Sequence, residues 1–234
     1  MEVSIILPAY NEAPRIESTV ERTAAALCDI TPSFEIIIAE DGSHDGTDRI
    51  CAALAKKYPF VVHLHSDERL GRGGAMNRAL RASKGDILCY IDVDLATDMK
   101  HLKELVQAIR DGYDFATGSR LLAESDVKRP LKRELASRGF NFLTRLLLGS
   151  KLYDHQCGFK SFKRDSIFAI MDAVKDTHWF WDTELLVRAQ RAGYRIKEFP
   201  VEWKHGGATK VNLIKDVFGM GSSIFRLWYE LLWD

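Results

Sequence analysis

Short apolar runs alternate with amphipathic segments along the first half of the chain. The runs have the length and continuity of buried parallel strands. They span Val3–Leu7, Phe34–Ala39, Val61–Leu64 and Ile87–Ile91. Between and after them, apolar residues recur at helical three- and four-residue steps, at Ile16, Val20, Ala24 and Leu27, at Ile50, Ala53 and Leu54, and at Leu102, Leu105, Val106 and Ile109. This order predicts an α/β fold, a mostly parallel, Rossmann-like sheet flanked by helices.

The second half of the chain has a less regular pattern. Helices are predicted over Leu135–Leu148 and Trp181–Ala192, and a strand over Ile196–Val201. The tail, residues 211–234, is predicted to contain an amphipathic helix, because its apolar residues recur at three- and four-residue steps. No repeat, low-complexity segment or linker interrupts the chain, so residues 1–234 are predicted to form one domain.

Composition excludes several classes of protein. The 33 Lys and Arg balance the 33 Asp and Glu, so no general attraction to nucleic acid is expected. Four cysteines without a C-x-x-C pair suggest reduced thiols, and a strand-like run directly after Met1 suggests no signal peptide, so we expect a cytoplasmic protein. The late apolar stretch Val217–Phe225 is far short of the roughly 20 residues that span a bilayer. A membrane-bound substrate would therefore be met peripherally, at the cytoplasmic face.

Acidic residues follow the predicted strands, where parallel sheets bind their ligands. Asp92 and Asp94 are two residues apart in an extended segment, so their carboxylates point to the same face and repel unless a cation lies between them. Oxygen ligands of this kind suit Mg²⁺ or Mn²⁺, which also bind a diphosphate. The alternative is an acidic strand end that faces water.

A second acidic pair, Glu40 and Asp41, ends another predicted strand. A turn and a helix cap explain the Gly42, Ser43 and Asp45 that follow. They leave Glu40 and Asp41 unexplained, because two adjacent acids at a strand end need partners or water. The N–H of a nucleobase and the hydroxyls of a ribose would be suitable donors.

These segments together resemble the family 2 glycosyltransferases. The resemblance rests first on Pro8-Ala9-Tyr10-Asn11-Glu12, the run from Glu40 to Thr47, and Asp92-Val93-Asp94. Later segments are similar to the dolichyl-phosphate mannose and glucose synthases, namely Gly118-Ser119-Arg120, Gln156-Cys157-Gly158-Phe159-Lys160 and the run from Trp181 to Leu186. The resemblance covers Val3 to about Asn212. It implies a GT-A fold and an inverting transfer of a hexose from a nucleotide sugar, UDP-glucose or GDP-mannose, to a polyprenyl or dolichyl phosphate.

The resemblance also implies roles for individual residues. The nucleoside pocket would be lined by Pro8, Tyr10, Glu12 and Asp41. Asp92 and Asp94 would hold the metal and the diphosphate. Mannose-type relatives often carry Gln where this chain has Ala96, so a third side-chain ligand is absent there. The residues around Ala96, together with Gln156 and its neighbours, look more like the glucose-type branch.

Basic residues are concentrated in the segment from Lys128 to Arg145, which has six Lys or Arg and a single acid, Glu134. Such a run is usually a solvated helix face, but Arg also binds phosphate through a rigid fork. The resemblance favours phosphate binding and places Arg120, Arg133 and Ser137 near the donor and acceptor phosphates. It also matches Lys204 and Lys210 to a late basic loop, although relatives often have Arg in place of Lys204.

Other features leave alternatives open. Asp182 and Glu184 could form a general-base pair or, as we favour, orient the basic loop. The turn Arg72-Gly73-Gly74 could cradle phosphate through its backbone N–H groups or simply precede a helix. The apolar face of the tail helix could dock on a membrane, on the domain, or in a homodimer or a separate membrane partner.

Competing functions follow from the same residues. A phosphate acceptor is already an anion and needs cations more than a base, which fits the excess of Arg and Lys. Transfer to a sugar hydroxyl would instead need Asp182 or Glu184 as the base. A nucleotidyltransferase fits poorly, because a Gly-rich basic loop does not follow the first strand. A non-catalytic, sugar-nucleotide-binding membrane-docking module is the remaining alternative.

Overall fold

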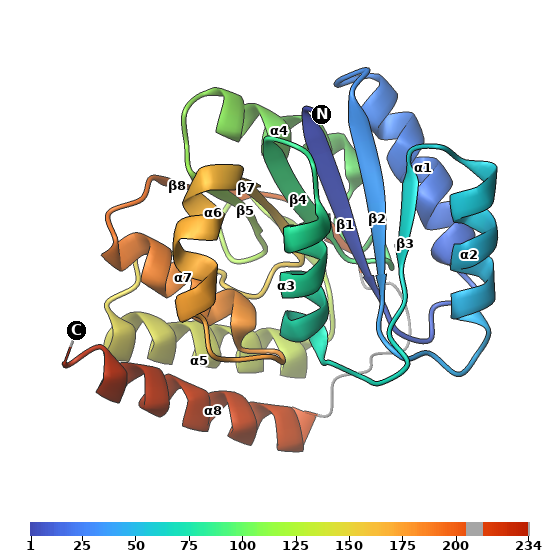
Figure 1. The fold of residues 1–234 in the computed structure, drawn as a ribbon. Helices are drawn as coiled ribbons and strands as arrows, with labels where there is room; N and C mark the ends of the chain where they lie inside the picture. Colours follow the sequence, from blue (N-terminus) through green and yellow to red (C-terminus); the bar gives the residue numbers. More distant parts are fainter. Residues whose placement is uncertain (205–212, 234) are drawn as a thin grey trace.

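Seven strands form one twisted sheet at the centre of the protein (Figure 1). The computed structural model describes residues 1–204 and 213–233, with side chains omitted for 213–218. The strand order is β3-β2-β1-β4-β7-β5-β8, and only β7 runs antiparallel to its neighbours. The seven strands are β1 Val3–Ala9, β2 Phe34–Glu40, β3 Val61–Leu64, β4 Ile87–Ile91, β5 Phe115–Ser119, β7 Phe159–Lys163 and β8 Ile196–Pro200. A separate parallel pair consists of β6 Asp126–Lys128 and β9 Glu202–Lys204.

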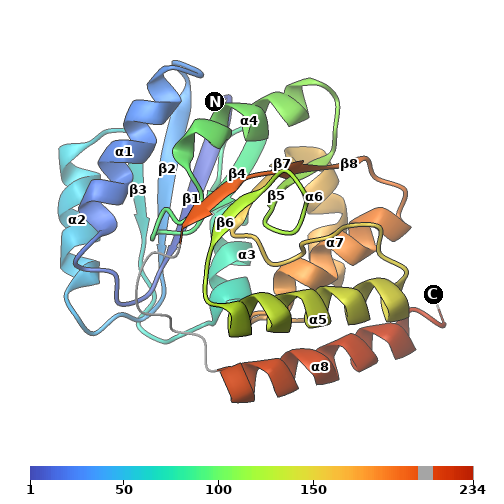
Figure 2. The ribbon, with the colours of Figure 1, turned by 180° about the vertical axis from the view of Figure 1, so that it is seen from behind.

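Helices cover both faces of the sheet, because successive side chains of each strand point to opposite faces. One face buries Ile5 and Ile36 under α1, α2 and α4, and the other buries Ile6 and Ile37 under α3, α6 and α7 (Figures 1 and 2). The helices are α1 Ile16–Cys28, α2 Thr47–Lys57, α3 Arg72–Ala82, α4 Leu102–Arg110, α5 Leu131–Leu148, α6 Arg164–Ile170, α7 Trp181–Arg191 and α8 Leu213–Glu230, with short 3-10 turns at Met99–His101 and Met171–Ala173.

Helices α5 and α8 lie side by side beyond the carboxyl ends of the parallel strands (Figures 1 and 2). A third apolar cluster joins them to α7; its buried members are Leu148, Phe180, Val187, Met220, Ile224, Leu227 and Leu231. The described residues contain no helix that is both long and apolar enough to cross a membrane. All four cysteines are free thiols, and three of them are buried.

The structure confirms the mostly parallel sheet and the amphipathic tail helix. It corrects two helix starts: α5 begins at Leu131 rather than Leu135, and α3 begins at Arg72 itself. The N–H groups of Gly73 and Gly74 donate to the Thr177 carbonyl at 2.8 and 3.2 Å, so this turn offers no free backbone cradle for phosphate.

Candidate active site

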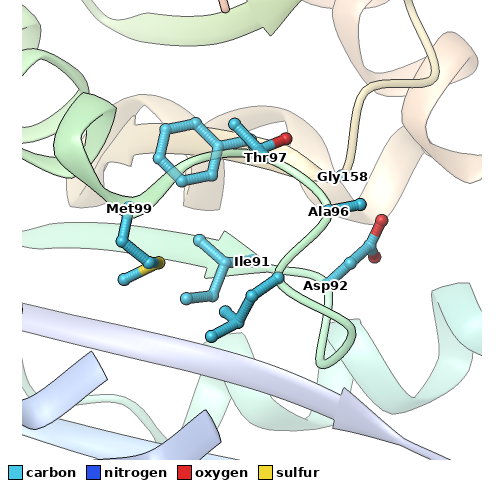
Figure 3. A pocket seen from close by; sticks show the side chains of 8 residues that line it. Ile91, Asp92, Ala96, Thr97, Met99 and Gly158 are labelled. Carbon is cyan, nitrogen blue, oxygen red and sulfur yellow. The ribbon is translucent and has the colours of Figure 1, made fainter. Parts of the chain in front are cut away.

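The D-x-D segment forms a tight turn after β4. The Asp92 N–H donates to the Gly158 carbonyl at 3.0 Å, and Leu95 adopts a positive φ of 46° as the chain reverses. A Cβ at Gly158 would lie 1.9 Å from Asp92 Oδ2, so any side chain at this position would displace the carboxylate (Figure 3). A cavity of about 10 Å³ behind the turn, lined in part by Ala96, has room for about one water molecule. The Q-C-G-F motif and the D-x-D motif therefore meet at one point.

The negative charge at this turn is concentrated on neighbouring carboxylates. Desolvation raises the pKa of Asp94, and the charges of Asp92 and Glu12 raise it further. The Asp92 side chain is 38% exposed, so one of the carboxylates remains accessible to a ligand. A divalent cation would relieve the repulsion between them.

Arg72, at the start of α3, already provides a positive charge beside Asp92. Its Nη2 lies 2.6 Å from Asp92 Oδ1, and its Nε lies 3.7 Å from Asp182 Oδ2. Burial opposes the charged guanidinium, but Asp92, Tyr90 and Asp182 together hold the pKa of Arg72 above its usual range. This role could not be predicted from the sequence, since Arg72 and its two carboxylates are far apart in the chain.

Asp182 belongs to a buried charge network. Its Oδ1 accepts a hydrogen bond from the Tyr90 hydroxyl and lies 3.3 Å from Nζ of Lys160, which is fully buried. Lys160 also donates to the Cys157 carbonyl at 2.5 Å. Asp182 therefore balances two cations, Lys160 and Arg72.

Glu184 takes part in a different network. Its carboxylate is fully buried and pairs with Arg226 at 2.6 Å and Arg188 at 2.9 Å, and it also accepts the N–H groups of Lys175 and Asp176. Glu184 has no oxygen left to accept a substrate proton. Within the described residues, no hydrogen bond or ion pair joins either acid to Lys204. The geometry thus argues against Glu184 as a base, while the support of the basic loop stays a prediction, because most of that loop lies outside the described residues.

The loops after β1 and β2 are joined by hydrogen bonds. Asn11, at a positive φ of 52°, donates its N–H to Ser43 Oγ at 2.9 Å and accepts the His44 N–H at 2.9 Å. Asp41 accepts the N–H groups of Leu70 at 2.7 Å and Gly71 at 3.1 Å. The Asp41 carboxylate, for which the sequence suggested no partner, therefore accepts two hydrogen bonds from the backbone of the protein itself.

The other residues expected around a nucleoside lie in the same region. The Arg69 guanidinium covers the Tyr10 ring at 3.8 Å, and Glu12 pairs with Arg15 at 3.2 Å. Pro8 is half-buried and pairs with Ala39 in the sheet. Arg69 and Arg15 bring positive charge to this end of the site.

A basic cluster lies between β5 and α5. Arg120 forms a two-pronged ion pair with the buried Asp154, at 2.7 and 2.9 Å, and its N–H donates to the same carboxylate at 3.0 Å. The Nε and Nη2 atoms of Arg129 and the Oγ of Ser137 are buried without a hydrogen-bond partner. Burial and the charge of Arg120 lower the pKa of Arg129. Arg133, in the first turn of α5, is half-buried.

Lys204 adjoins the D-x-D turn through its backbone. Lys204 ends β9 opposite Lys128 of β6, and its N–H donates to the Ala96 carbonyl at 2.8 Å. The Gln156 N–H donates to Asp154 at 3.0 Å. Lys210 lies outside the described residues.

A hollow of about 670 Å³ adjoins the basic cluster. Its lining is mixed: Arg120, Arg138, Glu124, Glu134 and Ser125 are polar, and Leu121, Leu122, Ala123, Val127 and Tyr153 are largely apolar. One wall is the amino-terminal half of α5. Sequence reasoning missed Asp154, which adjoins the Q-C-G-F motif, and it gave no individual role to Arg129 or Lys160, which lie within segments that it recognised.

A GT-A sheet with an acidic turn at its carboxyl edge defines a class of glycosyltransferases. The chain belongs to glycosyl transferase family 2, whose model matches residues 4–169. It is 55% identical over 234 residues to the glycosyltransferase AglD of Haloferax volcanii. This match covers 99% of this chain but only 38% of the length of AglD. It is 32% identical over 248 residues to a dolichyl-phosphate beta-glucosyltransferase of Drosophila melanogaster, covering 99% of this chain and 76% of that protein. The protein is therefore a family 2 glycosyltransferase.

Solved structures share the fold. Glucosyl-3-phosphoglycerate synthase from Mycobacterium tuberculosis, solved with Mn²⁺ and UDP, superposes with a TM-score of 0.69 at 20% identity, over 97% of this chain and 78% of that one. A mannosyltransferase from Pyrobaculum calidifontis, solved with GDP-Man and Mn²⁺, gives a TM-score of 0.60 at 21% identity, over 89% and 58%.

Proposed function

We propose that this glycosyltransferase moves a hexose from a nucleotide sugar, UDP-glucose or GDP-mannose, to the phosphate of a polyprenyl or dolichyl lipid, with inversion at the anomeric carbon. The observation that carries the proposal is the basic cluster: Arg129 and Ser137 have buried polar atoms without partners, beside Arg120 and a partly apolar hollow. Buried guanidinium nitrogens without hydrogen-bond partners are costly, and a phosphate would satisfy them. The names of the dolichyl-phosphate glucosyltransferase relatives agree with this acceptor.

Asp92 and Asp94 would hold a Mg²⁺ or Mn²⁺ ion, since carboxylate oxygens suit these ions and their crowded charges call for a cation. The ion would stabilise the charge that develops on the leaving diphosphate. Arg72, already paired with Asp92, would supply a second positive charge there. The proposed nucleoside pocket, with Pro8, Tyr10, Glu12 and Asp41, adjoins this point through the loop before α3.

The acceptor phosphate would need no base, because its oxygen is already an anion. A phosphate oxygen forms the new bond to the anomeric carbon, and the bond from that carbon to the diphosphate breaks. Arg120, fixed by Asp154, would orient the acceptor, with Arg129, Arg133 and Ser137 completing its contacts. Lys204, beside Ala96, is placed to contact either phosphate, and Gln156 would contact the substrate from beside Asp154.

The lipid chain of such an acceptor suits the outer face of α5 and α8. Ten of the thirteen exposed large hydrophobic residues of the described chain lie on these helices or just after α8; they are Leu131, Leu135, Phe142, Leu143, Leu146, Phe225, Trp228, Tyr229, Leu232 and Trp233. An apolar face of this kind supports peripheral membrane docking. Leu231 is buried and does not belong to this face, and Arg226 pairs with Glu184 and Glu230.

The test is a transfer assay with purified protein. UDP-glucose and GDP-mannose are each supplied with Mg²⁺ or Mn²⁺ and with either a polyprenyl phosphate or simple sugars. We expect a lipid-linked hexose, lost in excess EDTA and in Asp94→Asn. Arg129→Ala should lower turnover by about ten- to hundredfold, the loss of a charge-assisted hydrogen bond, while Arg49→Ala on the exposed side of α2 leaves it unchanged. Product on sugars alone would establish the alternative, transfer to a sugar hydroxyl.

A further inference from the structure

Two histidines and a glutamate gather where β2 and β3 end. One ligand atom from each of Glu40, His63 and His65 lies within 4.8 Å of the others. His63 and His65 are two residues apart on an extended segment, so both rings project from the same side of β3. Glu40 is on the neighbouring strand and shares its face with Ile36, the face covered by α2. The cluster is separate from the D-x-D turn, which follows β4.

The local bonding leaves one ring nitrogen without a partner. His63 Nε2 is buried and has no hydrogen-bond partner, which costs free energy unless something binds it. His65 Nδ1 is 2.5 Å from Glu40 Oε2, and its other nitrogen, Nε2, is 3.1 Å from Asp67 Oδ1. A carboxylate on the outer nitrogen is the arrangement that orients metal-binding histidines.

We propose that Glu40, His63 and His65 form a binding site for a divalent transition-metal ion, with Zn²⁺ the best match, distinct from the Mg²⁺ or Mn²⁺ expected at Asp92 and Asp94. Two imidazoles and one carboxylate are a set of donors that Zn²⁺ uses, whereas Mg²⁺ prefers oxygen alone. The His65 side chain is 44% exposed, so the ion can enter from solvent and keep a water ligand.

A metal ion there would brace the loop that follows β2. Glu40 uses its other oxygen, Oε1, to accept the Ser43 N–H at 2.5 Å, so fixing Glu40 also fixes the turn beside Asp41. The nearest cation, Arg78, directs its guanidinium at the carbonyls of Glu40, Leu64 and His65, which already ties the two strand ends together. These bonds hold the three ligands close together, and an ion that binds there would replace the hydrogen bond between His65 Nδ1 and Glu40 Oε2.

Cobalt is the probe, because Co²⁺ in a site of imidazole and carboxylate ligands absorbs visible light. Untagged full-length chain is titrated with Co²⁺, and Zn²⁺ is then added to displace it. We expect His63→Gln and His65→Gln each to weaken binding by about 10- to 100-fold or more, and Asp67→Asn, at a 97% exposed side chain, by about 10-fold. His44→Gln, an exposed histidine outside the cluster, is the matched control and should bind as the wild type does.

Asp92→Asn and Asp94→Asn separate this site from the D-x-D turn. Retention of the Co²⁺ spectrum in both, with its loss in the histidine variants, supports the proposal. An unchanged spectrum in the histidine variants, loss only in the aspartate variants, or no spectrum at all would overturn it. Glu40 is not substituted, because it is fully buried and braces the Ser43 turn. Zn²⁺ should also raise Tm in the wild type but not in His65→Gln, and neither readout depends on glycosyl transfer.

Discussion

Gly158 occupies a position where a methyl group would strike the Asp92 carboxylate, at 1.9 Å from Oδ2. We expect Gly158→Ala to push Asp92 out of place, to weaken Mn²⁺ binding, and to lower turnover roughly 100-fold, as displacements of about 1 Å can do. Steady-state kinetics across Mn²⁺ concentrations would measure both effects. Gly139→Ala in α5 is the control, because a Cβ there meets nothing within 4 Å. Equal kinetics for the two variants would contradict this account of Gly158.

Arg72 links the carboxylates of Asp92 and Asp182. Arg72→Ala should destabilise the fold by about 1–3 kcal/mol, less than a fully buried pair would cost, because Asp92 is 38% exposed and Asp182 keeps Lys160. Arg72→Lys should keep most of that stability but lose turnover, because a single ammonium cannot reach Asp92 and Asp182 as a fork does. Urea unfolding and transfer assays on both variants test this. Wild-type turnover in Arg72→Lys would show that charge alone suffices.

The residues found from the sequence are those that belong to short motifs. Asp92, Asp94 and Arg120 could be proposed as site residues because each lies in a recognisable local pattern. Arg72 and Asp154 could not, since their importance lies in partners 20 and 34 positions away, at Asp92 and Arg120. In the sequence Arg129 is one of six basic residues in its segment. What distinguishes it in the structure is that its Nε and Nη2 atoms are buried without a hydrogen-bond partner.

Two ion pairs join helix α8 to helix α7. Glu184 pairs with Arg226, and Arg188 pairs with Glu230, so each helix carries one acid and one base of the set. We expect Glu184→Gln to cost about 3–5 kcal/mol near neutral pH, because it leaves Arg188 and Arg226 facing an uncharged group. Arg22→Gln, a change on the exposed side of α1, should cost much less.

The effect of Glu184 should depend on pH in a defined direction. Burial alone would raise the pKa of Glu184, but hydrogen bonds from Arg226, the Lys175 N–H and Arg188 lower it below its usual 4.5. The stability it provides is therefore complete above pH 4.5 and is lost as the pH falls through the lowered pKa. The free energy of unfolding is measured for Glu184→Gln and the wild type at pH 7 and at pH 3.5. The difference between the two proteins should be smaller at pH 3.5. A gap that widens with acid would contradict the assignment.

Elements with continuous apolar runs were predictable, and those with polar sequences were not. Strands β1 to β4 and helices α1, α2 and α4 follow simple periodicity, and the structure extends β1 and β2 by only a few residues. Strand β7 was not predicted, because its sequence, Phe-Lys-Ser-Phe-Lys, is too polar for a buried strand. In the structure Lys160 and Ser161 are nevertheless fully buried, and the Ser161 hydroxyl donates a hydrogen bond to the Leu105 carbonyl. Burial of a lysine depends on a partner, here Asp182, that the local sequence does not reveal.

At the scale of the whole molecule, α5 and α8 present one apolar face. Phe142→Glu combined with Phe225→Glu should reduce binding to phospholipid vesicles by at least about tenfold, because burying each Phe contributes roughly 1.5–3 kcal/mol. Co-sedimentation with vesicles measures it, and Lys56→Glu on α2 controls for added negative charge. If vesicle binding is unchanged while a wild-type dimer dissociates, the face is a contact between two copies of the chain.

Strand β7 has a consequence for how the chain matures on the ribosome. It enters the sheet between β4 and β5, and it is synthesised well after both. Until residue 163 has emerged, the nascent chain presents the edge of β4 with open N–H and C=O groups, a template for wrong pairing. The turn at Asp92 also lacks its Gly158 neighbour for the same interval. A growing polypeptide of this enzyme is therefore most prone to aggregate between the synthesis of β4 and that of β7, which is when a holding chaperone would protect it most.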